Sequence, residues 1–166
     1  TFYEAKPFFE SLKKKDSKAV KNLKPVFNDP EINGYCQSFG ITFNDKTKTQ
    51  YRTIHSRGGP FQLTEYEASH IKGKTQFKRI SIMPLCENLP KREEHGTAAI
   101  SKDGSLVSLF DFASNSTKLY SLEVQNGKSI CHEILDLGIP TGALDFSYDG
   151  NKITFHVTFL DIDYAD

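Results

Sequence analysis

The sequence contains few of the residues that build helical cores. Its 166 residues include no Trp and one Met, whereas 13 Phe and seven Tyr supply much of the large apolar surface. Aromatic side chains suit the half-buried faces of pleated sheets, so the composition favours a mainly β fold. No apolar run reaches the ~18–20 residues of a membrane-spanning helix, and the sequence therefore predicts no membrane span.

Motifs for common catalytic chemistry are also missing. No Gly-x-Ser-x-Gly elbow of a serine hydrolase occurs, and the Gly-Gly-Pro of residues 58–60 is too short to cradle a phosphate. The five histidines are scattered, and no two share one expected element at the spacing of metal ligands. These absences favour a non-catalytic role.

The three cysteines, Cys36, Cys86 and Cys131, form no Cys-x-x-Cys pair, which argues against zinc ribbons and c-type haem attachment. Two arrangements remain open. An exported protein would carry a Cys36–Cys86 disulfide with Cys131 buried, whereas a cytosolic one would keep three buried thiols.

Charge is balanced overall but not along the chain. Residues 1–92 hold 17 Lys and Arg against nine Asp and Glu, a net +8, and residues 93–166 hold four against 12, a net −8. Either two solvated faces attract each other weakly, or the first half offers a basic surface to an anionic partner. Because the lysines interleave with acids and accompany no nucleic-acid-reading motif, we do not expect a nucleic-acid partner.

One short phrase occurs twice. Residues 101–104 read Ser-Lys-Asp-Gly and residues 147–150 read Ser-Tyr-Asp-Gly, each followed by an apolar stretch and 46 residues apart. A period of roughly 40 to 50 residues with an Asp-Gly turn between apolar strands indicates stacked β units. We expect the Asp-Gly pair to supply the positive φ angles of a tight turn and the Ser to hydrogen-bond its backbone.

The residues around the first phrase predict a four-stranded antiparallel meander. Asn126-Gly127 supplies a second tight hairpin, and the whole meander has the size of one propeller blade. A further unit begins at Ala143 and stops after two strands. The expected strands of the complete unit are 97–101, 106–112, 118–124 and 129–135.

These phrases resemble the repeats of TolB-type and WD40-like β-propellers over about residues 97–159, although both copies lack the proline that the family places before the Asp. The resemblance implies four-stranded blades whose loops contact a partner. A closed propeller needs at least four blades, about 160 to 180 residues, and the chain shows about two and a half. We therefore expect an incomplete propeller, finished by remaining blades of the same assembly or by another polypeptide.

Two further regions precede this unit, which occupies residues 91–166. In residues 1–30, apolar positions at Phe8, Leu12, Val20 and Leu23 in a Lys-rich background predict a short helical segment that Pro25 ends. Residues 31–90 form an irregular β region, interpreted as a degenerate blade without the Asp-Gly phrase. Its expected strands are 35–43, 49–55, 65–71 and 75–83.

We expect a non-catalytic protein-interaction domain that is part of a larger chain or assembly, in the periplasm or secreted. The alternative is the propeller portion of an enzyme whose catalytic residues lie outside this chain. Expected exposed contact residues are Tyr51, Arg52, Arg57, Phe112 and Tyr164.

The end of the chain suggests one metal site. Asp161, Asp163 and Asp166 place three carboxylates in an Asp-x-Asp-x-x-Asp run, whose oxygens suit a hard cation such as calcium. The alternative is an acidic loop leading to the next strand. The sequence indicates no other cofactor.

Overall fold

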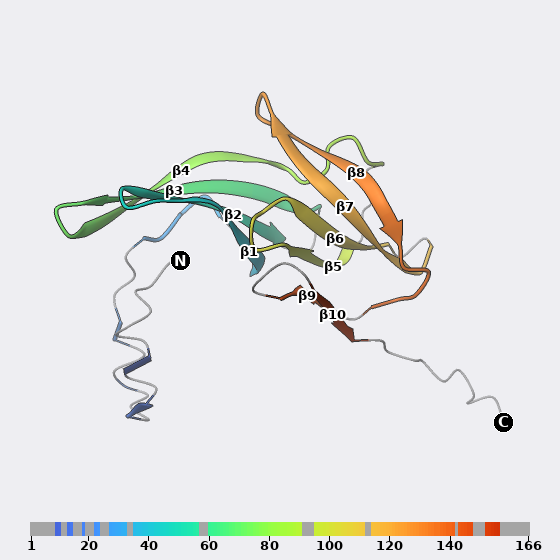
Figure 1. Cartoon of the computed structure of the whole chain (residues 1–166), viewed down its shortest axis with the longest axis horizontal. Coiled ribbons are helices and arrows are strands. Elements are labelled where there is room, and N and C mark those ends of the chain that lie inside the picture. Colours follow the sequence, from blue (N-terminus) through green and yellow to red (C-terminus); the bar gives the residue numbers. More distant parts are fainter. Residues whose placement is uncertain are drawn as a thin grey trace.

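The computed structural model describes residues 9–10, 13–14, 18, 22–23, 27–32, 35–56, 60–90, 95–111, 114–141, 143–147 and 152–156. These residues form a mainly β structure of ten antiparallel strands in three sheets (Figure 1). Two sheets have four strands each and the third has two, so the expected mainly β fold with four-stranded antiparallel sheets is confirmed. No helix in the described part of the chain is long and apolar enough to cross a membrane.

The first sheet contains the four strands expected between residues 35 and 83. Each strand pairs with the next along the chain, in the order β1-β2-β3-β4. Lys72 and Gly73 connect β3 and β4 with φ angles of 50° and 75°, as in a two-residue type I′ turn. The strands are β1 (Tyr35–Asn44), β2 (Lys48–Ser56), β3 (Gln62–Ile71) and β4 (Lys74–Pro84).

The second sheet also has four strands, each paired with the next along the chain, and the third sheet consists of two paired strands. Asn126 and Gly127, with φ angles of 52° and 75°, form the expected tight hairpin. The second sheet contains β5 (His95–Ile100), β6 (Leu106–Asp111), β7 (Ser116–Gln125) and β8 (Lys128–Asp136), and the third contains β9 (Ala143–Phe146) and β10 (Ile153–His156).

The Asp-Gly turn differs in part from the expectation. Gly104 has a φ of 73°, but Asp103 does not adopt a positive φ. Gly104 N–H donates to the Ser101 carbonyl at 2.9 Å, so a turn over residues 101–104 ends in a left-handed glycine. The expected role of the serine is confirmed, because Ser101 Oγ accepts from Leu106 N–H at 2.9 Å.

A β-bulge shows that the first two sheets are built alike. Tyr66 pairs with Arg79 and Glu65 with Ser81, which leaves Ile80 as an extra residue in β4. Ile134 is the extra residue in β8 in the same way. Each isoleucine follows its hairpin glycine by seven residues, and each is about half exposed. The first sheet is therefore the same kind of unit as the second, although it lacks the Asp-Gly phrase.

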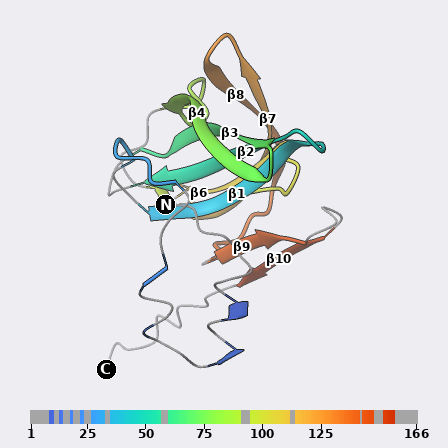
Figure 2. The same cartoon turned by 90° about the vertical axis from the view of Figure 1, so that its left-hand side faces the viewer.

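The units stack side by side, with their first strands in contact. β1 contacts β5, and β5 contacts β9. Figure 2 shows the β7–β8 hairpin projecting past the first sheet. Both four-stranded sheets are open, and the described strands do not close into a ring. The core lies between the first two sheets and includes Ile54, Leu63, Met83, Val107, Tyr120 and Leu122.

The opposite face of the first sheet is covered by residues 27–32, which we call the N-terminal cap. Side chains alternate along a strand, so Tyr66 of β3 and Phe77 of β4 lie on the face away from Leu63 and the core. Phe27 packs on both rings, with centroid distances of 5.9 Å. The cap therefore takes the place where a neighbouring sheet would pack.

A buried carboxylate fixes this cap. Asp29 is 8% exposed, accepts hydrogen bonds from Arg79 Nη1 at 2.7 Å and from the Tyr66 hydroxyl at 3.2 Å, and so anchors the cap to two strands. Burial, together with the nearby Asp29 charge, raises the pKa of Tyr66, which keeps the hydroxyl protonated as a donor.

The expected helical segment in residues 1–30 lies largely outside the described residues. Among those described, Lys14 N–H donates to Glu10 and Asn22 N–H to Lys18, each bond spanning four residues as in an α-helical turn. The helix remains a prediction.

Cysteine pairing corrects the sequence-based expectation. Cys86 and Cys131 form a disulfide with a Cα–Cα distance of 4.9 Å, whereas Cys36 is free and exposed. The expected Cys36–Cys86 pair is therefore wrong, and so is the alternative of three buried thiols. The Asn88 side chain bonds both backbone groups of Cys131: it donates to the carbonyl at 2.7 Å and accepts from the N–H at 2.8 Å. Because Asn88 follows Cys86 by two residues, these bonds hold Cys86 close to Cys131.

Candidate functional site

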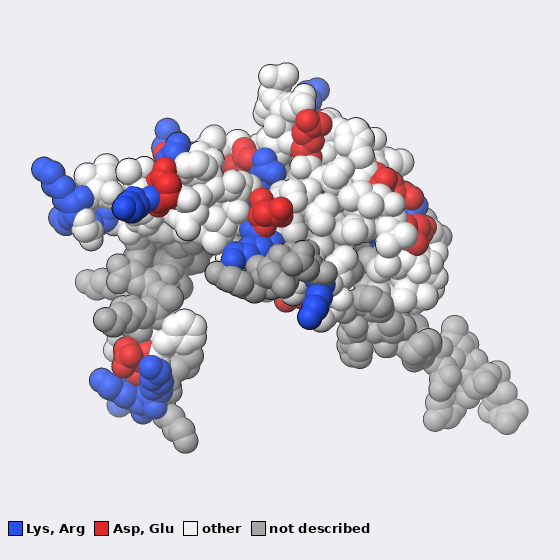
Figure 3. All heavy atoms as spheres, viewed as in Figure 1, with Lys and Arg blue, Asp and Glu red and all other residues white. Residues whose placement is uncertain are grey.

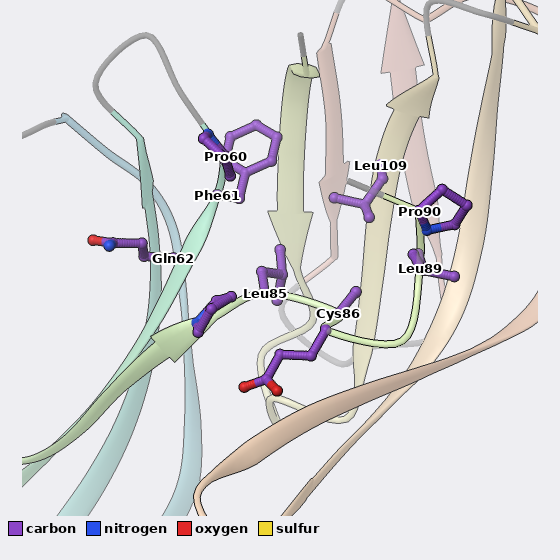
Figure 4. Close-up of a pocket in the computed structure, with 10 residues that line it drawn as sticks. Pro60, Phe61, Gln62, Leu85, Cys86, Leu89, Pro90 and Leu109 are labelled. Atoms are coloured by element: carbon purple, nitrogen blue, oxygen red, sulfur yellow. The ribbon is translucent and has the colours of Figure 1, made fainter. Parts of the chain in front are cut away.

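A pocket of about 520 Å³ opens between the first two sheets (Figure 4). Its walls come from three parts of the chain: the start of β3, the connection that follows β4, and β6. Most of the lining is apolar and includes three prolines. The lining residues are Pro60, Phe61, Gln62, Pro84, Leu85, Cys86, Glu87, Leu89, Pro90 and Leu109.

The connection after β4 shapes the pocket because it is held at several points. Leu85 N–H donates to the Phe61 carbonyl at 2.9 Å, which ties the connection to the start of β3. Cys86 has a φ of 55°, and its N–H donates to Ser129 Oγ of β8 at 2.7 Å. With the disulfide to Cys131, these bonds hold the wall in one position.

Polar groups lie at the edge of the pocket. Gln62 and Glu87 are exposed, while Phe61 and Leu109 are buried in the wall. In Figure 4 the Gln62 amide points away from the apolar residues. An apolar cavity with a few polar groups at its mouth suits a ligand that inserts an apolar group and keeps its polar part in water.

A smaller cavity of about 170 Å³ shares Leu89, Pro90 and Leu109 with this pocket. Its other end is polar. Lys118 Nζ lies 3.1 Å from a carboxylate oxygen of Glu133, and this hydrogen bond raises the pKa of Lys118 and keeps it charged. The two cavities form a cleft that is apolar at one end and charged at the other.

Basic side chains of the first sheet gather away from this cleft. Figure 3 shows basic side chains at the outer end of this sheet, with acidic residues beside them. Lys46, Lys72 and Lys74 are exposed there, and Lys48 pairs with Glu67 at 3.6 Å. Both interpretations of the charge asymmetry, solvated faces or an anionic partner, remain predictions.

Two expected contact residues are not exposed. Arg52 Nε lies 3.1 Å from Glu65 Oε1, and its Nη1 donates to the Gly104 carbonyl at 2.9 Å, so Arg52 links the two sheets. Tyr51 is half-buried on the other face, with its ring 6.3 Å from that of Phe77. The expected exposure is wrong because β2 is an interior strand and both of its faces are covered.

The remaining expected site residues lie outside the described residues: Arg57, Phe112, Tyr164, Asp161, Asp163 and Asp166. The calcium site therefore remains a prediction. Within the described ranges, no group of three His, Cys, Asp or Glu side chains is placed to hold a metal ion.

Sequence reasoning missed the pocket. Leu89 and Pro90, in the connection that follows β4, line both cavities, and no sequence motif marked them. Phe61 and Leu109 come from separate sheets, and only the packing of those sheets brings them together. The one available signal was the run of apolar residues and prolines after β4.

No protein-family model and no curated protein matches this chain.

Proposed function

We propose that the chain is a non-catalytic protein-interaction domain built from propeller-like units, and that it works as part of a larger assembly. The observation that carries this proposal is the apolar pocket between the first two sheets. Its volume falls within the range of about 300–1,000 Å³ that is usual for ligand sites. Pockets between packed sheets are suited to side chains presented by a neighbouring polypeptide.

The proposed ligand is an extended segment of a partner protein. One large apolar side chain of this segment enters between Phe61, Leu85 and Leu109, and the exposed Glu87 carboxylate accepts a hydrogen bond from its backbone at the rim. The wall needs little rearrangement, since the disulfide and Ser129 already fix it. Such preorganisation lowers the entropic cost of binding.

The disulfide also supports a location outside the cytoplasm. Cys86 and Cys131 are both buried, at 4% and 2% exposed, and they join two elements of the core. Structural disulfides persist in oxidising compartments and are rare in reducing ones. We propose a periplasmic or secreted protein.

Selection from a displayed library of random 12-residue peptides tests the binding role. Enriched peptides should share one large apolar residue and should lose at least tenfold in affinity on Leu89→Gln, because Leu89 lines both cavities. Ile71→Gln is the matched control, since Ile71 is 54% exposed at a hairpin tip away from the pocket. Fluorescence anisotropy measures the affinities, and thermal melting checks that both variants fold.

Two results would contradict this proposal. One is the absence of any enriched peptide. The other is an equal loss of affinity in Leu89→Gln and Ile71→Gln, which would place binding elsewhere.

A further inference from the structure

The smaller cavity of the cleft extends from the apolar pocket onto the polar end of the second sheet. Its lining beyond the shared residues consists of Phe110, Asp111, Lys118, Tyr120 and Glu133. Because Leu89, Pro90 and Leu109 line both cavities, the two cavities are neighbours. A segment whose side chain fills the pocket therefore has the charged cavity within reach.

Strand pairing places charged residues on the face of the second sheet that carries the core, which we call the core face. Leu109 of β6 belongs to the core and pairs with Lys118 of β7, which in turn pairs with Asp136 of β8. Directly opposed residues share a face of a sheet, and so do residues two apart on one strand. Asp111, two residues after Leu109, therefore lies on the core face with Lys118 and Asp136.

Negative charge exceeds positive charge at this end of the core face. Glu133 of β8 pairs with Tyr120, a core residue, so it lies on the same face. Lys118 Nζ lies 3.1 Å from Glu133 Oε2 and 3.5 Å from Asp136 Oδ2. With Asp111, one positive charge stands against three negative charges, which leaves a net formal charge of −2.

Glu133 is the carboxylate that a ligand can reach. Its side chain is 48% exposed, whereas that of Lys118 is 19% exposed. Asp111 is 5% exposed and accepts a hydrogen bond from the Ser114 hydroxyl at 2.7 Å, so it adds charge from within the wall. Charges that are partly buried are screened by salt less than exposed ones are.

This excess of negative charge favours a cationic group on the ligand. A carboxylate or phosphate would be repelled, whereas a guanidinium group can give two parallel N–H bonds to the carboxylate of Glu133. Glu133 lies on β8, two strands from Leu109 on β6, which is a separation of about 10 Å across the sheet. An extended segment covers about 10 Å with three residues.

We propose that the cleft selects partner segments with an arginine or lysine about two to four residues from the large apolar residue. The apolar side chain fills the pocket, and the basic side chain enters the smaller cavity and binds the carboxylate of Glu133. This inference rests on the proposed binding role of the cleft and adds the charge of the partner segment.

Parallel selections test this inference. The displayed library of random 12-residue peptides is selected against the protein, against Glu133→Gln and against Glu123→Gln. Glu123 is the matched control, because its carboxylate is exposed and it follows the core residue Leu122, which places it on the opposite face of the sheet. Arg and Lys near the shared apolar residue should be enriched at least about threefold by the protein and by Glu123→Gln, but not by Glu133→Gln.

One enriched peptide then measures the contact itself. Its basic residue is replaced by norleucine, which keeps a long unbranched side chain and removes the charge. Fluorescence anisotropy should show at least about fivefold weaker binding to the protein, but less than about twofold weaker binding to Glu133→Gln. Added NaCl should reduce the difference. Thermal melting checks that the variants fold.

The two proposals fail separately. Enriched peptides without basic residues, or equal weakening by norleucine in the protein and in Glu133→Gln, would overturn the inference while leaving the apolar pocket as the binding site. An unchanged affinity in Leu89→Gln would contradict the proposed role of the pocket, whereas the comparison with Glu133→Gln would still measure the contact to the basic residue.

Basic residues of the chain itself are tested as the alternative occupant, because Lys91 and Arg92 follow Pro90 in the sequence. The selection is repeated with Lys91→Gln and Arg92→Gln combined in one variant. Enrichment of Arg and Lys by this variant alone would overturn the inference, because the chain's own residues would then fill the cavity. Equal enrichment by the variant and the unchanged protein is the result expected for a partner segment.

Discussion

At the scale of single residues, Gly40 is required where two units meet. β1 passes against the 101–104 turn, and Ile41 N–H donates to the Lys102 carbonyl. A Cβ atom on Gly40 would overlap the Ser101 carbonyl oxygen and lie 2.9 Å from Gly104 N. Gly40→Ala should therefore destabilise the protein by about 1–3 kcal/mol, measured by urea unfolding.

Gly73→Asn is the control for Gly40→Ala. A Cβ atom on Gly73 would meet nothing within 4 Å, and Asn tolerates its φ of 75° better than most residues do. If Gly40→Ala lowers the free energy of unfolding no more than Gly73→Asn does, the stability of the protein does not depend on the close approach of the two sheets at Gly40.

His55 makes stability depend on pH. Burial lowers the pKa of His55 below its usual value, so the unfolded chain binds a proton at pH values where the folded protein does not. The folded protein should lose stability as the pH falls through the usual histidine pKa of about 6.5, because the unfolded state gains the proton first. His55→Gln should flatten this dependence, as measured by urea midpoints at several pH values. His132→Gln, which removes a histidine at an exposed position, is the control.

At the scale of elements, the N-terminal cap depends on one carboxylate. Asp29→Ala removes the acceptor of Arg79 and of the Tyr66 hydroxyl, and should cost about 1–3 kcal/mol of stability. Glu31→Ala removes an ion pair to the same Arg79, but Glu31 is 67% exposed, so the cost should stay below about 1 kcal/mol. Thermal melting compares the two, and equal effects would show that the buried bonds do not hold the cap.

Strands were predictable because their signals are local. Alternating apolar residues and turn pairs such as Asn126-Gly127 predicted each of the ten strands found among the described residues, although the ends of the strands differ by a few residues. The bulges at Ile80 and Ile134 were not predicted, because an extra residue is defined only by the partner strand. For the same reason, Arg52 was expected to be exposed when it in fact bonds across the two sheets.

At the scale of the whole molecule, the disulfide joins the connection after β4 to β8 and closes a loop of 45 residues. Restricting the unfolded chain in this way contributes about 4 kcal/mol in the chain-entropy model. Replacing both Cys86 and Cys131 by Ser should therefore lower the free energy of unfolding by several kcal/mol, measured in urea without reductant. Cys36→Ser is the control, because Cys36 is exposed and unpaired.

Thiol counting checks the pairing directly. The denatured protein, kept free of reductant, should show one reactive thiol per chain, because only Cys36 is free. Three reactive thiols would show that the disulfide does not form.

The sequence by itself determined the mainly β class, the strand order and the presence of a turn at the first Asp-Gly phrase, since these follow from side-chain alternation and from residues that favour turns. Only the tertiary structure decided the Cys86–Cys131 pair, the link from Arg52 to Gly104 and the pocket between the sheets. These features join residues far apart in the chain. Their positions depend on how the sheets pack, which local sequence signals do not specify.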